Sequence, residues 1–503
     1  MSASVSRRRF FQRAGSLLVL LGTPPLDGAR RASTPQTPYE HGLWLSGDHH
    51  IHTKYSSDGR YEIIEQVRAA ERSGLGFCVI TDHGGPSHQK VVTAVAYREL
   101  LEARRACPGI IVFQGLEWNI PSAEHGSIIV PPTHDEAQII EQFESRFDAK
   151  SRKDPPLGEP DAVAGVSFLQ SLPSRPLFFA NHPARRGLDS PHELRAWSDA
   201  GPDVMRGFEG APGHSASTLM GELRGHYADK SSAGSFPGYP TESYRTFGGY
   251  DYYTAEVGGL WDSLLSEGRP FYITCNSDSH RYLGDLVEVD RSTYKRDGFV
   301  TPLGTQRPYR DGETRYDFDY PPGLYTSTRV FAKSRDPIEV LAAMRAGNMY
   351  TCLGGLIESL RFFVHDGTQA VPMGGFLQLT KPGATVELIV DIELSEQRNL
   401  GGLIPALHHF DLIVGEVGPP VAHRDTLRSP SAKILRRVLP SDCERSGRRL
   451  RFRQRFRNVS RSFFVRVRGT NTSVVSPQLD PPDIDPWSDL WFYGNPIFVM
   501  QKR

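Results

Sequence analysis

Short apolar runs recur through the first two thirds of the chain, and histidine or carboxylate side chains follow each run closely. Residues 77–80 lead to His83, for example, and residues 177–180 lead to His182. Continuous apolar runs of this length are typical of parallel strands buried on both faces. Segments with helical periodicity, such as residues 61–73, lie between them. Because the carboxyl ends of barrel strands meet at one rim, the pattern predicts a (β/α) barrel with these side chains gathered there.

The polar residues after these runs are of the types that bind transition metals. Imidazole and carboxylate groups suit zinc, iron or manganese, and no cysteine is among them. The set is too large for one tetrahedral ion, so the sequence predicts more than one metal. Its three carboxylates would leave a net positive charge on such a centre, which favours a phosphate-bearing substrate. The candidate ligands are His50, His52, Asp58, His83, Glu117, His125, His182, Asp278 and His280.

The order of these motifs resembles the PHP family, named after its polymerase and histidinol phosphatase members. The resemblance spans about residues 43–355 and runs from an HxH motif to a DxH motif. It implies a distorted seven-stranded (β/α) barrel that holds up to three divalent ions of zinc, manganese or iron and hydrolyses phosphoesters. By position, it assigns His50, His52, Glu117 and Asp278 to a first metal, Glu117, His125 and His182 to a second, and Asp58, His83 and His280 to a third.

Catalysis is expected to depend on metal-activated hydroxide, with Glu117 and Asp278 as the carboxylates that hold the metals. Metals about 3.5 to 4 Å apart can share a hydroxide and clamp the attacking and leaving oxygens. Arg185, with Arg186 beside it, follows His182 closely enough to reach a substrate phosphate. A surface salt bridge is the alternative for these arginines.

Two further carboxylates lie just before histidine motifs. Asp48 precedes the HxH motif, and Asp82 directly precedes His83. Each can orient a ligand imidazole through its second nitrogen. Each can equally well cap backbone amides at a strand end, and the sequence leaves both roles open.

The last third of the chain has a different pattern. Short strands follow one another without helices between them, for example residues 386–392 and 410–414. This predicts an all-β, sandwich-like domain over residues 356–503. Within it, arginines alternate with other residues from Arg449 to Arg457, so that they share one face of a strand. A solvated outer face is one interpretation, and contact with an anionic envelope surface such as lipid headgroups is the other.

The barrel domain is expected to cover residues 39–355, which include every candidate ligand. Two stretches rich in glycine, proline, tyrosine and charged residues, near 187–253 and 283–325, are predicted to be insertions beside the site. The β domain is expected to support or position the enzyme without supplying catalysis, because the ligand set ends at His280.

The first 38 residues are predicted to be an export signal and linker. Residues 6–12 contain consecutive arginines followed by Phe10 and Phe11, and they resemble the twin-arginine signal. The apolar stretch over residues 14–22 is too short to cross a bilayer stably. The sequence therefore predicts a periplasmic protein that acquires its metals before export.

Composition narrows the choice of partner. Lys+Arg and Asp+Glu both number 58, and this zero net charge indicates no specific nucleic-acid partner. The main hypothesis is a phosphoesterase acting on a small phosphomonoester or on a phosphodiester. One alternative is an amidohydrolase-like C–N hydrolase, whose barrel also opens with HxH but commonly uses a carboxylated lysine. The other is a noncatalytic, metal-bound envelope binding protein.

Overall fold

The computed structural model of the chain describes residues 37–152, 154–221, 234–285, 287–306 and 319–502. Its N-terminal part is a curved α/β barrel in which seven strands follow one another in chain order. They are β1 (Leu43–Ile51), β2 (Phe77–Ile80), β3 (Ile111–Asn119), β4 (His125–Val130), β5 (Leu177–Ala180), β6 (Met205–Ala211) and β7 (Tyr272–Cys275). The export signal falls almost wholly outside the described ranges and stays a prediction.

The barrel strands are parallel except at β4. β1, β2 and β3 pair in parallel, as do β5, β6 and β7, whereas β4 is antiparallel to both of its neighbours. A parallel bridge between Ile51 and Ser279 brings the segment after β7 back beside β1. The predicted α/β class with parallel strands is confirmed, with a β3–β4 hairpin in place of one βα unit.

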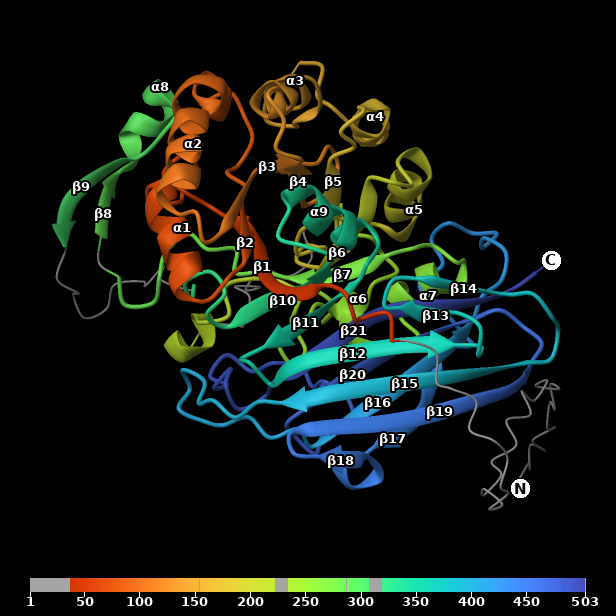
Figure 1. The fold of residues 1–503 in the computed structure, drawn as a ribbon. Coiled ribbons are helices and arrows are strands. Elements are labelled where there is room, and N and C mark those ends of the chain that lie inside the picture. The colour runs from red at the N-terminus through yellow and green to blue at the C-terminus, as the bar shows by residue number, and fades with distance from the viewer. Residues whose placement is uncertain (1–36, 153, 222–233, 286, 307–318, 503) are drawn as a thin grey trace, which may run out of the picture.

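Helices cover the outside of the barrel (Figure 1). In α1, Ile63, Val67 and Ala70 are buried at helical spacing, so one face of the helix packs on the sheet. This packing leaves the rim at the carboxyl ends of the strands for polar side chains. The helices are α1 (Ile63–Arg72), α2 (Tyr97–Ala106), α3 (Glu136–Phe147), α4 (Glu159–Ser171), α5 (Pro191–Ala200), α6 (Tyr252–Ala255), α7 (Leu260–Ser266), α8 (Tyr294–Asp297) and α9 (Pro337–Arg345).

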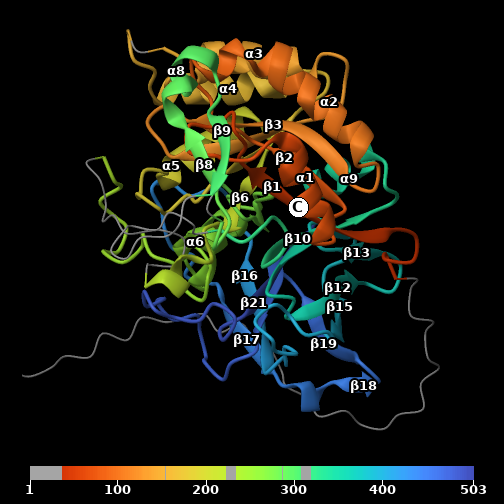
Figure 2. The same cartoon turned by 90° about the vertical axis from the view of Figure 1, so that its left-hand side faces the viewer.

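Two antiparallel layers form the C-terminal part (Figure 2). One has the order β13-β12-β15-β19-β18, and the other continues the barrel sheet through β10, β11, β21, β20, β16 and β17. Phe410 and Phe452 meet between the layers with ring centroids 5.9 Å apart. The predicted all-β domain is confirmed, and its two layers are built mainly of antiparallel strands. Its strands and the two that lead to it are β10 (Thr326–Ala332), β11 (Met349–Leu353), β12 (Ile357–His365), β13 (Ala370–Pro372), β14 (Phe376–Leu379), β15 (Ala384–Leu394), β16 (His409–Glu416), β17 (Lys433–Val438), β18 (Glu444–Ser446), β19 (Arg449–Val459), β20 (Phe463–Thr470) and β21 (Trp491–Gln501).

The two parts are joined by buried polar contacts as well as by the shared sheet. Asn495 in β21 accepts a hydrogen bond from the backbone N–H of Ile273 in β7 (2.8 Å) and donates one to the carbonyl of Met349 (3.0 Å). Arg466 in β20 donates two hydrogen bonds to Asp262 in α7, at 2.7 and 2.8 Å. Both partners of that ion pair are fully buried. The C-terminal strands therefore form part of the support of the barrel.

The first of the two predicted insertions needs correction, whereas the second agrees with the structure. Residues 191–211, which we expected within the first insertion, form α5 and β6, and β6 lies between β5 and β7 in the barrel sheet. The apolar pattern of β6 is interrupted by Arg206, Glu209 and two glycines, which hid it. In the second stretch, β8 (Val287–Asp290) and β9 (Thr301–Gln306) form a separate two-stranded sheet outside the barrel.

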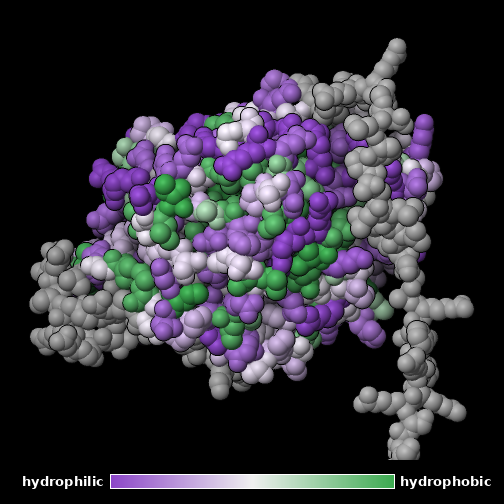
Figure 3. Space-filling view, turned by 90° about the horizontal axis from the view of Figure 1, so that it is seen from below, coloured by the Kyte–Doolittle hydropathy of each residue, from purple (hydrophilic) through white to green (hydrophobic). Residues whose placement is uncertain are grey.

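The arginine row of β19 faces carboxylates on the neighbouring strand β15. Arg451 pairs with Asp391 (2.6 Å), and Arg455 pairs with Glu387 (3.1 Å). These ion pairs offset much of the positive charge of the arginine row. They therefore support the interpretation of the row as a solvated outer face rather than as a contact with an anionic surface. Seen from below, the described surface intersperses hydrophilic and hydrophobic residues (Figure 3). Within the described ranges, no helix is long and apolar enough to serve as a membrane span.

Candidate metal centre

All nine predicted ligands lie close together at one rim of the barrel. His50 lies near the end of β1, and most of the others belong to the loops that follow parallel strands. His50 and His52 are two residues apart in extended backbone, so their rings leave the strand on the same side. The loops after β1, β2, β5 and β7 supply His52, Asp58, His83, His182, Asp278 and His280.

Two ligands reach the rim by a different route from the one expected. Glu117 lies inside β3, and His125 is the first residue of β4 rather than a residue after a strand. Because β4 is antiparallel to β3, the amino end of β4 lies at the same rim as the carboxyl end of β3. The hairpin places His125 Nδ1 3.1 Å from Glu117 Oε1.

Glu117 occupies the middle of the group. Its side chain is 1% exposed, and five imidazoles lie within 3.4 Å of its two oxygens. Burial opposes its ionisation, but the imidazoles, that of His125 foremost, hold the pKa of Glu117 well below its usual range. The carboxylate is therefore charged and suited to bridge two cations. Oε1 faces His50 (2.9 Å), His125 (3.1 Å) and His182 (3.3 Å), and Oε2 faces His52 (3.4 Å) and His83 (2.6 Å).

Asp278 provides a second buried carboxylate. Its Oδ1 lies 3.1 Å from Nε2 of both His50 and His52. The ligand atoms of these three residues all lie within 4.8 Å of one another, which is close enough for one ion to contact all three. The backbone of Asp278 has a φ of 48°, a left-handed conformation that is uncommon for a residue with a side chain.

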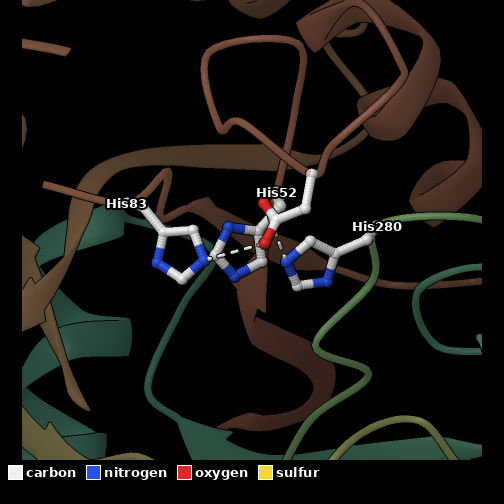
Figure 4. A group of neighbouring side chains, drawn as sticks. His52, His83 and His280 are labelled. Atoms are coloured by element: carbon white, nitrogen blue, oxygen red, sulfur yellow. Dashed lines mark ion pairs between the residues drawn. The ribbon is translucent and has the colours of Figure 1, made fainter. Parts of the chain in front are cut away.

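A further group surrounds Asp58 on the solvent side of the centre. Its Oδ2 lies 3.4 Å from His83 Nε2, and its Oδ1 lies 3.5 Å from His280 Nε2. The ring of His52 stacks on that of His280 with centroids 3.8 Å apart. Figure 4 shows the rings of His52, His83 and His280 around one carboxylate. The Asp58 side chain is 43% exposed, so this group is the part of the centre most accessible to solvent.

Unsatisfied polar atoms in the cluster fit metal ions. Glu117 Oε2, Asp278 Oδ1 and Asp58 Oδ1 are buried atoms that make no hydrogen bond of good geometry within the described part of the chain. Buried lone pairs of this kind are costly unless a donor or a cation meets them. Together with the imidazole nitrogens they form a donor set that suits zinc, manganese or iron. Several overlapping groups of three or four ligands are present, which fits more than one ion.

The first part of the barrel matches a known family. Residues 48–152 match the PHP domain. The matched segment holds six of the nine residues, from His50 to His125, while the other three lie beyond it. No curated protein matches the chain.

The solved structures that are similar to the chain include the following two. One is a two-domain protein from Bacteroides vulgatus that contains a predicted PHP-like metal-dependent phosphoesterase. Its sequence is 16% identical, the match covers 94% of this chain and 99% of that chain, and the TM-score is 0.34. The other is endonuclease Q in complex with a 27-mer duplex substrate with an abasic lesion, with 17% identity, coverage of 35% of this chain and 46% of that chain, and a TM-score of 0.22.

Glu209 in β6 is a residue of the site that sequence reasoning missed. Its Oε1 lies 2.8 Å from His50 Nδ1, and its Oε2 accepts a hydrogen bond from the backbone N–H of His182 (2.8 Å). A carboxylate on the second ring nitrogen fixes the orientation of a ligand imidazole. Glu209 thus orients two of the candidate ligands from a strand that no apolar run revealed.

Asp48 and Asp82 take different roles. Asp48 accepts hydrogen bonds from backbone N–H groups, including that of His50 (3.0 Å), and burial raises its pKa to about 7. Asp82 accepts a hydrogen bond from the hydroxyl of Ser56 (2.8 Å), and Ser56 Oγ lies 2.8 Å from His52 Nδ1. Asp48 therefore caps amides. Asp82 takes both roles, because it accepts a hydrogen bond from the backbone N–H of Thr53 (2.6 Å) and also orients His52 through the Ser56 hydroxyl.

Arg185 and Arg186 lie at the edge of the cluster, beside Glu124. Arg185 donates to Glu124 Oε2 (3.0 Å), and Arg186 Nε lies 3.4 Å from Glu124 Oε1. Glu124 Oε2 is in turn 3.7 Å from His182 Nδ1. The alternative of a salt bridge is thus observed for both arginines, and contact of Arg185 with a substrate phosphate stays a prediction.

Proposed function

We propose that the chain is a metal-dependent phosphoesterase that hydrolyses a phosphomonoester or a phosphodiester at a centre of up to three divalent ions. The observation that carries the proposal is the convergence of three carboxylates and six imidazoles around the buried Glu117. The match of residues 48–152 to the PHP domain supports the same class. His50, His52, Glu117 and Asp278 would hold the first ion, Glu117, His125 and His182 the second, and Asp58, His83 and His280 the third.

The charge of the centre favours a phosphate substrate. Three divalent ions bring six positive charges, and the three carboxylates return three negative ones, so an anionic substrate offsets the excess. When bound, such metals polarise a phosphoryl oxygen and lower the pKa of a water molecule that attacks phosphorus. The side chains of Glu117 and Asp278, 1% and 4% exposed, hold negative charge where bulk water is largely excluded. Asp58, at 43% exposure, lies where a substrate would enter.

Amidohydrolase-type C–N hydrolysis is the second candidate, because barrels of that type also open with HxH. Such sites commonly bridge their metals with a carboxylated lysine. Lys54, close to the HxH motif, instead pairs with Glu62 (2.5 Å) and Glu99 (3.0 Å). Glu117, with imidazoles on both of its oxygens, would take the bridging position instead, which favours the phosphoesterase. The completeness of the ligand set argues against the third candidate, a noncatalytic metal-bound binding protein.

A panel of substrates tests the proposal. The full chain, stripped of metal and then reconstituted separately with zinc, manganese or iron, should hydrolyse at least one phosphomonoester or phosphodiester and no amide. Chelation should abolish that activity, and added metal should restore it. Amide hydrolysis without phosphoester hydrolysis would replace the first candidate, the phosphoesterase, by the second, the C–N hydrolase.

The role of Arg185 is tested separately by kinetics. Arg185→Gln should raise KM for the phosphoester more than it lowers kcat, because the substitution would remove the predicted contact with the substrate phosphate.

A further inference from the structure

A histidine–aspartate pair outside the nine candidate ligands contacts the metal centre from the loop after β6. His214 Nε2 lies 3.0 Å from Asp278 Oδ2, the oxygen that does not face His50 and His52. His214 Nδ1 lies 2.5 Å from Asp319 Oδ1. The side chains of His214 and Asp319 are 11% and 1% exposed. Both ring nitrogens thus meet carboxylate oxygens in a nearly dry environment, where such hydrogen bonds are strong.

The backbone around His214 holds its ring beside Asp278. The N–H of His214 donates to the carbonyl of Ser277 (3.1 Å), next to Asp278. A Cβ at Gly213 would collide with that carbonyl oxygen and with the Cβ of Asp278, so only glycine allows the two loops to approach this closely. His214 and Asp278 both have positive φ values, 56° and 48°. Paired left-handed residues at a contact between loops are costly and mark a constrained functional site.

Asp319 connects this contact to a second part of the centre. Its Oδ2 accepts hydrogen bonds from the backbone N–H groups of His280 (2.5 Å) and Arg281 (2.8 Å). One carboxylate therefore holds Asp278 through the His214 ring and holds the backbone that carries His280. These two ligands belong to different proposed metal positions.

We propose that His214 and Asp319 are positioning residues that aim Asp278 Oδ1 at the first metal and fix His280 for the third. The inference rests on the metal centre of the proposed function, and it adds two residues that no sequence motif contains. A ligand carboxylate held by a hydrogen bond on its outer oxygen presents its other oxygen in one direction. Losing that support should weaken metal binding without removing any ligand.

The test is metal affinity, measured on the full chain by competition with a chromogenic chelator for Zn²⁺ and for Mn²⁺. His214→Leu should weaken binding of at least one ion by about 10- to 100-fold, the usual cost of losing a group that orients a ligand. His214→Gln should restore most of this affinity, because its amide can donate to Asp278 Oδ2. Asp319→Asn should weaken binding as well, and it serves as the test if His214→Leu does not fold.

A matched control is available in α5. His192 also lies between two carboxylates, Asp425 (2.6 Å) and Glu159 (3.5 Å), but on the surface. His192→Leu should leave metal affinity unchanged. Wild-type affinity in His214→Leu, or in Asp319→Asn if the first variant does not fold, would overturn the inference, as would a glutamine variant no better than the leucine one. A wild-type chain that binds metals but hydrolyses no phosphoester would refute the proposed function alone, whereas a chain that binds no metal refutes both.

Discussion

Replacing Glu117 with glutamine should lower phosphoester hydrolysis on the order of 10³-fold, the upper end of what removal of one electrostatic group costs in other active sites. The substitution preserves size but removes the negative charge that five imidazoles surround within 3.4 Å. Because Glu117 would bridge two ions, the variant should also lose one or more bound metals per chain. Metal content by mass spectrometry and initial rates with the best substrate measure both effects.

Glu136→Gln is a suitable control for this variant. Glu136 is also buried and charged, but it pairs with Arg104 in α2 and contacts none of the nine candidate ligands. It should keep wild-type metal content and turnover even if the loss of its charge costs some stability. Full activity in Glu117→Gln would show that the carboxylate holds no essential ion.

A chain that ends at Gly355 should fail to fold. All nine candidate ligands precede this point, but β21 pairs with β11 and would be lost together with the buried side chains of Trp491 and Phe498. The remaining barrel would expose the apolar surface that packs on these side chains, and the buried backbone groups of Ile273 and Met349 would lose their partner Asn495. These penalties fall on a domain whose typical net stability is only about 5 to 15 kcal/mol. Far-UV circular dichroism and soluble yield report the outcome. A soluble, folded truncation that retains its metals would contradict this account.

A point variant tests the same junction in the full chain. Asn495→Val leaves buried backbone groups of Ile273 and Met349 without their partner, so it should lower the free energy of unfolding by about 2 to 4 kcal/mol. Asn399→Val, in a more exposed loop with bonds to Gly354 and Leu403, should cost less than about 1 kcal/mol. Equal effects of the two variants in urea unfolding would show that β21 does not anchor the barrel.

The sequence predicted those parts of the fold whose signals are local. Apolar runs such as residues 77–80 and 177–180 form buried strands, because burial on both faces leaves no place for polar residues. The histidine and carboxylate motifs after them are brought to one rim because parallel strands end there. The strands of the C-terminal domain were recognisable from the absence of helical spacing between them.

Other parts depend on contacts that no local pattern encodes. β6 was missed because Arg206 and Glu209 interrupt its apolar pattern, and the polarity of Glu209 is itself a consequence of its contact with His50, 159 positions away. Asp319 lies 105 positions after His214 and belongs to no motif. The antiparallel β4 was unexpected because strand direction follows from the hairpin connection rather than from composition. Tertiary proximity, rather than residue type, gives these residues their roles.

Anomalous X-ray diffraction from crystals of the metal-reconstituted full chain tests the central claim most directly. Data collected on both sides of the manganese or zinc absorption edge locate each ion independently of the protein coordinates. The account predicts two or three anomalous peaks inside the cluster, with Glu117 in contact with two of them and Asp278 with one. Crystals that contain stoichiometric metal but show no peak within contact distance of Glu117 would contradict the assignment of the metal centre.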